Sequence, residues 1–233
     1  RDYEALAATC AKDNCDYVSF LLRLVEREAL DREKRAAERR VKTARFPIIK
    51  TLDTFDFKAQ PSIKQKLIRE LMVGQYADRQ ENVLLVGNSG TGKTHLAIAL
   101  GNSAARHGYR VRFFTAAGMV TLLEEKQNKY QLDRFLHQWD RTDLLICDEL
   151  GYLSFSRAGA ELLFQVFADR YERKSLMITS NLAFSDWGQI FQGERMTAAL
   201  LDRLPHHCDI FEMNGESYRF RESMKQKKQP RKK

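Results

Sequence analysis

The residues from Gly87 to Thr94 carry the strongest chemical signal, because they fit the spacing G-x-x-x-x-G-K-[ST] of a phosphate-binding loop. Glycines let such a loop curl until its backbone N–H groups face phosphate oxygens. A helix that starts after the loop adds the partial positive charge of its N-terminus. The pattern predicts ATP binding by a continuous set of residues: Gly87, Asn88, Ser89, Gly90, Thr91, Gly92, Lys93, Thr94 and His95.

Two residues of this loop have separate predicted tasks. Lys93 is expected to reach the β- and γ-phosphates, and Thr94 to offer its hydroxyl to Mg²⁺. The same glycines without suitable flanks would indicate only a turn. Here an apolar run precedes the loop and an amphipathic stretch follows it, so we expect ATP and Mg²⁺ as cofactors.

An acidic pair, Asp148 and Glu149, ends the apolar run that starts at Leu144. A buried strand seldom ends in two acids, because an uncompensated buried carboxylate is costly. We expect Asp148 to hold Mg²⁺ directly or through water. Glu149, one residue further out, is the predicted general base that polarises an attacking water. With the phosphate-binding loop upstream, the pair predicts hydrolysis as well as binding.

Two further residues are candidates for the same site. Asn181 follows an apolar run, and the carboxyl ends of adjacent parallel strands share one crevice, so it can lie beside Glu149 and orient water. It can also cap the next helix, and the two roles are compatible. Arg203, on a short predicted helix, can stabilise transition-state charge in a neighbouring subunit or form an ordinary ion pair with Asp202. Spacing alone does not choose between these.

The scaffold for these residues is predicted from alternating apolar and amphipathic segments. Several strands are apolar throughout, which is typical of a parallel sheet covered by helices on both faces. The fold class is therefore α/β, a three-layer arrangement around a parallel five-stranded sheet. Strands are expected at 82–86, 110–115, 144–148, 175–180 and 208–212, and helices at 93–107, 117–129, 132–139, 158–173, 184–190 and 197–204, with Ser62 capping a helix towards Gln75.

The first 46 residues are predicted to form a helical appendage. Asp16 is a plausible helix N-cap. The apolar residues after it have the spacing of one buried helix face: Tyr17, Phe20, Leu21 and Leu24. A charged helical stretch follows, whose basic stripe can lie along the phosphates of nucleic acid: Arg32, Arg35, Arg39 and Lys42.

Charge is concentrated at the two ends of the chain. The net charge is +8, and six of the last nine residues are basic. A near-neutral body with basic ends indicates a polyanionic partner, although a solvated helix and a disordered tail would give the same composition.

We expect an appendage (1–46), an ATPase domain (47–220) and a basic disordered tail (221–233). Neither a secretory signal nor a membrane-spanning run is evident, so we expect a cytoplasmic protein without a membrane partner.

Several of these segments together closely resemble the IstB family, AAA+ ATPases encoded beside the transposase in one class of bacterial insertion sequences. The resemblance covers nearly the whole chain and is carried by 39–47, 82–101, 148–153, 179–182, 184–188, 200–204 and 215–219. It implies that Lys93 and Thr94 form the Walker A pair and that Asp148 and Glu149 form the Walker B pair. It also implies that Asn181 is the sensor residue and that Arg203 reaches in trans into the adjacent subunit.

The resemblance further implies an ATP-dependent homo-oligomer on double-stranded DNA, which remodels the target and recruits or stimulates a cognate transposase. Fewer than twenty-five residues follow Glu212, so we expect no C-terminal lid domain, and Phe55 and Phe57 become candidates for flanking the adenine. A DnaC-type replicative helicase loader remains the alternative. A small-molecule phosphotransferase is disfavoured by Glu149 and Asn181 and by the lack of an evident acceptor pocket.

Overall fold

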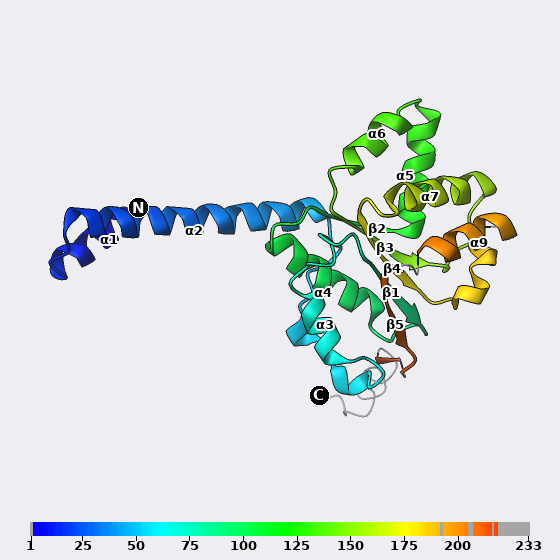
Figure 1. The fold of residues 1–233 in the computed structure, drawn as a ribbon, viewed down its shortest axis with the longest axis horizontal. Helices are drawn as coiled ribbons and strands as arrows, with labels where there is room; N and C mark the ends of the chain where they lie inside the picture. Colours follow the sequence, from blue (N-terminus) through cyan, green and yellow to red (C-terminus); the bar gives the residue numbers. More distant parts are fainter. Residues whose placement is uncertain (1, 192, 205–206, 216, 219–233) are drawn as a thin grey trace, which may run out of the picture. The chain divides into compact units, whose positions relative to one another are not determined.

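The computed structural model describes residues 2–191, 193–204, 207–215 and 217–218 (Figure 1). The chain divides into two compact units, 1–39 and 40–233. The division falls within a long helix, whereas the sequence suggested a boundary after Phe46. The expected basic tail, 221–233, lies outside the described residues.

The first unit contains helix α1 (Asp2–Lys12) and most of helix α2 (Tyr17–Ala44). The carboxylate of Asp16 accepts a hydrogen bond from the backbone N–H of Ser19 at 2.7 Å, so the expected N-cap is confirmed. The Arg23 guanidinium of α2 reaches back to Asp13, 3.4 Å away. The predicted burial of the apolar face of α2 is only partly confirmed: Phe20 and Leu24 are half-buried, but 93% of Tyr17 and 59% of Leu21 is exposed.

The second unit is built on five parallel strands in the order β2-β3-β4-β1-β5. The central strand β1 pairs with β4 on one side and β5 on the other, so Leu84 lies between Ile178 and Ile210. All five predicted strands are present within one residue of their expected ends, apart from β3, which runs on to Leu150. Their bounds are β1 Asn82–Gly87, β2 Val111–Thr115, β3 Leu144–Leu150, β4 Ser175–Ser180 and β5 Cys208–Met213.

Helices cover both faces of this sheet, as Figure 1 shows, and the predicted three-layer α/β fold is confirmed. Side chains alternate along each strand, so Leu84 packs into one hydrophobic core and Leu85 into the other. One face carries α3 (Gln65–Leu71) and α4 (Lys93–Arg106). The other carries α5 (Ala116–Asn128), α7 (Arg157–Arg170), α8 (Gly188–Phe191) and α9 (Glu194–Arg203), with α6 (Leu132–Trp139) packed on α5.

Several predicted helix bounds are wrong: the helix expected to run towards Gln75 ends at Leu71, the one expected from 197 begins at Glu194, and the one expected over 184–190 is a 3₁₀ turn (Phe184–Asp186) followed by α8. Two of the differences have identifiable reasons. Helix α3 begins at Gln65 and is not capped by Ser62, because a turn in which Ile63 donates to the Gln60 carbonyl comes first. Helix α7 ends at Arg170, because the next residue has extended ψ and the buried Arg170 guanidinium donates to the carbonyls of Thr142 and Ser175. No helix in the described part of the chain is both long and apolar enough to span a membrane.

Candidate nucleotide site

A cavity of about 370 Å³ lies at the carboxyl end of the sheet. The phosphate-binding loop from Ser89 to His95 forms one wall, and Glu149 and Thr179 extend from the ends of β3 and β4. The opposite wall comes from the segment before β1, which contributes Phe55 and Gln60. Elements that are distant in sequence therefore meet around the predicted nucleotide site.

The loop owes its shape to glycines with positive φ angles. Gly90 has φ +81° and Gly92, the N-cap of α4, has φ +97°. A Cβ atom at Gly92 would lie 2.7 Å from the ring of Phe55, so an alanine there would meet both backbone strain and a clash. The loop is thus held in a conformation that exposes backbone N–H groups at the start of α4.

The Lys93 ammonium group is held inside the loop. It donates hydrogen bonds to the carbonyls of Gly87 at 2.6 Å and Asn88 at 2.7 Å. The Thr91 hydroxyl donates to the same Asn88 carbonyl at 2.8 Å. These bonds keep the lysine charge at the loop, where a phosphate oxygen can replace a carbonyl as acceptor.

The predicted magnesium ligands are adjacent. The Thr94 hydroxyl donates to Oδ1 of Asp148 at 2.9 Å, and the Thr179 hydroxyl donates to the same oxygen at 2.6 Å. Burial raises the pKa of Asp148, while the two hydroxyls and the charge of Lys93 oppose that rise. Hydroxyl and carboxylate oxygens are the ligands that Mg²⁺ takes in nucleotide sites, so this pair fits the ion.

The backbone of Glu149, unlike that of Asp148, has a positive φ angle. Its φ of +64° places it in the left-handed region, next to an irregularity between β3 and β4. Its backbone N–H donates to Oγ1 of Thr179 at 2.9 Å. As a result Asp148 is buried, whereas Glu149 is exposed and lines the cavity.

The structure does not bring Asn181 and Arg203 to the cavity wall of their own chain. The Oδ1 atom of Asn181 is buried without a hydrogen bond among the described residues, and it lies beside the turn at Gly151 that follows Glu149. Arg203 is exposed at the end of α9, with its guanidinium 6.0 Å from the ring centre of Tyr171. That position leaves Arg203 accessible to another subunit.

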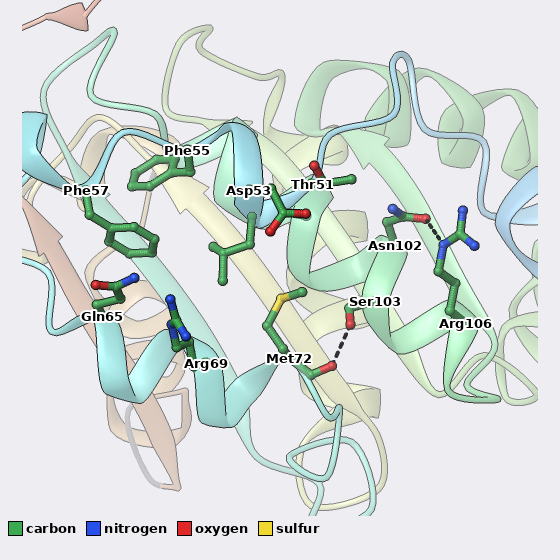
Figure 2. A pocket seen from close by; sticks show the side chains of 12 residues that line it. Thr51, Asp53, Phe55, Phe57, Gln65, Arg69, Met72, Asn102, Ser103 and Arg106 are labelled. Carbon is green, nitrogen blue, oxygen red and sulfur yellow. Dashed lines mark hydrogen bonds between the residues drawn. The ribbon is translucent and has the colours of Figure 1, made fainter.

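The segment before β1 contains both aromatic candidates for flanking the adenine. Phe55 lines both the nucleotide cavity and a neighbouring hollow of about 570 Å³, whereas Phe57 lines that hollow but not the nucleotide cavity (Figure 2). His95 turns its ring towards this segment, with Nε2 3.0 Å from the Thr51 carbonyl. Burial lowers the pKa of His95. Of the two phenylalanines, only Phe55 is placed to flank a base.

Two of the four basic side chains in the predicted stripe are paired with an acidic side chain of the same helix. Arg32 and Arg35 both contact the carboxylate of Glu28, at 2.7 and 3.2 Å. The hydrogen bond from Arg32 is the largest cause that lowers the pKa of Glu28. Arg39 and Lys42 are exposed. Within helix α2, Glu28 therefore offsets part of the charge that the sequence pattern assigns to the stripe.

The sequence pattern did not single out Thr179 or Gln60. Thr179 belongs to a motif that drew attention to Asn181, and its role depends on the pairing of β3 with β4. Gln60 lies in an irregular segment with no motif, so no sequence signal was available for it.

Comparison with known proteins is consistent with this geometry. Residues 1–226 match the family described as IstB-like ATP binding protein. An insertion sequence IS5376 putative ATP-binding protein from Geobacillus stearothermophilus is 42% identical over 94% of this chain and 88% of its own length. An insertion sequence IS21 putative ATP-binding protein from Pseudomonas aeruginosa is 42% identical over 95% of this chain and 84% of its own.

Solved structures with the same fold include a helicase loader and DnaA. A DnaC helicase loader has a TM-score of 0.55 and 23% identity, and the match covers 64% of this chain and 87% of that one. AMPPCP-bound DnaA from Aquifex aeolicus has a TM-score of 0.56 and 23% identity over 76% of this chain and 55% of that one. At these identities the similarity establishes the fold alone.

Proposed function

Because this chain belongs to the IstB-like ATP-binding protein family, we propose that it hydrolyses ATP with Mg²⁺ and thereby controls its own assembly on duplex target DNA. The assembly remodels the DNA and recruits or stimulates a cognate transposase. One observation carries the hydrolytic part: the Thr94–Asp148–Thr179 hydrogen-bonded row lies directly beside the exposed Glu149.

Each residue of the site has a defined task in this proposal. Lys93 exchanges its two carbonyl acceptors for phosphate oxygens when the nucleotide enters. Thr94 and Asp148 hold Mg²⁺, which when bound neutralises charge on the phosphate oxygens. Glu149 accepts a proton from the attacking water.

The proposal also assigns Arg203 to the site of an adjacent subunit. Its support is the exposure of Arg203 and its place outside its own chain's cavity. A guanidinium that approaches the transferred phosphate stabilises charge in the transition state. Hydrolysis would then require a neighbour, and this requirement couples turnover to assembly.

The DNA part of the proposal is supported by charge and by the relatives. Arg39 and Lys42 are exposed on one helix, and contacts of this kind attract phosphates without reading base sequence. The two relatives at 42% identity are named as insertion-sequence proteins, which favours a role beside a transposase.

Sedimentation velocity tests the proposal. The purified chain is run with ATP, ADP or no nucleotide, with and without a duplex of about 50 base pairs, at two salt concentrations. We expect large particles only with ATP and duplex, and fewer of them at the higher salt. A species that ignores both nucleotide and duplex would refute assembly on DNA. Glu149→Gln should retain the large particles for longer, because it slows hydrolysis.

A helicase-loader function is the second candidate. The exposed apolar side chains at the start of α2, including Tyr17 and Leu21, are suited to holding a protein partner. The similarity to the DnaC helicase loader shows a shared fold and does not decide between the two functions. Assembly that depends on ATP but is indifferent to duplex would favour this candidate.

A further inference from the structure

The side-chain amide of Gln60 is buried at the nucleotide cavity without a hydrogen bond. Only 1% of this residue is exposed, and both Oε1 and Nε2 are unpaired within the described part of the chain. The backbone groups of Gln60, in contrast, are hydrogen-bonded: its N–H donates to the Phe57 carbonyl, and its carbonyl accepts from the N–H of Ile63. The amide therefore needs an explanation that the fold itself does not supply.

An unpaired buried amide is costly. Each polar group left without a partner costs about 1–3 kcal/mol, and native proteins leave few such groups. An apolar side chain of similar volume would fill the same space without that penalty. A ligand with matching hydrogen-bonding groups would account for the presence of glutamine.

The surroundings of Gln60 have the character of a pocket for a base. Ala59, Ile98 and Phe55 supply apolar wall on the same cavity as the phosphate-binding loop. Gly215, after β5, is packed against the amide so closely that a Cβ there would lie 2.4 Å from Oε1. Apolar side chains next to a polar group that can fix orientation are typical of sites that orient a small molecule.

The segment after β5 also contacts the loop that holds the phosphates. The backbone N–H of Tyr218 donates to the Gly90 carbonyl at 3.0 Å. Gly215 and Tyr218 thus connect the amide of Gln60 with the loop. A base beside Gln60 and phosphates beside Gly90 can belong to one nucleotide.

We propose that Gln60 recognises the base, with its amide hydrogen-bonded to the edge of adenine that carries the exocyclic amine. That amine donates to Oε1, and the neighbouring ring nitrogen accepts from Nε2. The inference rests on the proposed ATP-dependent function and adds the residue that makes the site select adenine.

Binding of nucleoside diphosphates tests this, because diphosphates avoid turnover. Titration calorimetry compares ADP with purine riboside diphosphate, which lacks the exocyclic amine, and with inorganic tripolyphosphate. The wild-type chain should bind ADP about ten- to a hundredfold more tightly than the analogue. Gln60→Met should lower ADP affinity towards that of the analogue and leave tripolyphosphate affinity unchanged. Gln65→Met, in the neighbouring hollow of Figure 2, is the matched control and should keep the wild-type preference.

Two further readouts separate a ligand role from a structural one. Without nucleotide, Gln60→Met should unfold at the wild-type temperature or above it, since the side chain of Gln60 makes no hydrogen bond with the residues that the structure describes. Gly215→Ala should also reduce the preference for ADP, because its methyl group displaces the amide. The inference is wrong if Gln60→Met keeps the wild-type preference for ADP over purine riboside diphosphate. It is also wrong if the variant loses affinity for ADP and tripolyphosphate equally. In both cases the proposed function stands. If the folded wild-type chain binds neither ADP nor tripolyphosphate, both fail.

Discussion

Thr179→Val tests the hydrogen-bonded row that joins β3 to β4. The hydroxyl donates to Asp148 at 2.6 Å and accepts from the backbone N–H of Glu149 at 2.9 Å. Valine has nearly the same shape and removes both bonds. The residue is 1% exposed, so water cannot readily replace the lost partners.

The expected loss of stability follows from the two bonds. A bond to a carboxylate contributes about 1.5–3 kcal/mol and a neutral one about 0.5–1.5 kcal/mol, so the two together contribute about 2–4.5 kcal/mol. For a chain of this size that loss lowers the unfolding midpoint by roughly 5–15 °C. Turnover of ATP should fall as well, because the left-handed conformation of Glu149 loses the bond that holds it.

The loss should also depend on pH. The Thr179 hydroxyl favours the ionised form of Asp148, whose pKa burial already raises, so valine raises that pKa further. The contribution of the hydroxyl is present when Asp148 is ionised and is lost as the pH falls through its pKa. Thermal unfolding without nucleotide should therefore show a larger difference between wild type and variant at about pH 8 than at about pH 5.

Thr197→Val is the matched control for this measurement. Thr197 is 8% exposed, and its hydroxyl donates to the Gly193 carbonyl, which also accepts from the backbone N–H of Thr197. That carbonyl keeps a partner in the variant, so the control should lose under about 1 kcal/mol. The reasoning is refuted if Thr179→Val is no less stable than the control, or if the difference widens on acidification.

Four other substitutions follow from the same geometry. Glu149→Gln should slow phosphate release by about 10²–10⁴-fold with unchanged ADP affinity, and unaltered turnover would remove Glu149 as the base. Asp148→Asn should raise the unfolding midpoint in EDTA, because burial raises the pKa of Asp148 and the ionised carboxylate therefore destabilises the folded chain. This gain in stability should grow as the pH rises. A loss of stability at neutral pH would contradict the reasoning. Arg39→Gln should reduce the salt dependence of duplex binding by about one unit of slope, whereas Arg32→Gln should change it less, because Glu28 already pairs with Arg32. Equal slopes for wild type and Arg39→Gln in duplex titrations would exclude Arg39 from the contact.

Local sequence determined the phosphate-binding loop and the strands that flank it. The loop motif is continuous, and its glycines, lysine and threonine act through the backbone and side chains of one turn. Strands β1 and β3 were predictable because both of their faces are buried, so each contains a continuous apolar run. Asp148 was predictable because acids at the end of such a strand require a partner, and Thr94 and Thr179 provide it.

Only the tertiary structure decided which side chains meet across elements. Thr179 bridges Asp148 and Glu149 because β3 pairs with β4, and strand order is not encoded in either strand alone. Gln60 meets Gly215 because the segments before β1 and after β5 converge at the cavity. The apolar spacing of α2 identified a helix face but not a partner for it, so its exposure could not be inferred. Periodicity reports which residues share a face, whereas burial depends on what packs against that face.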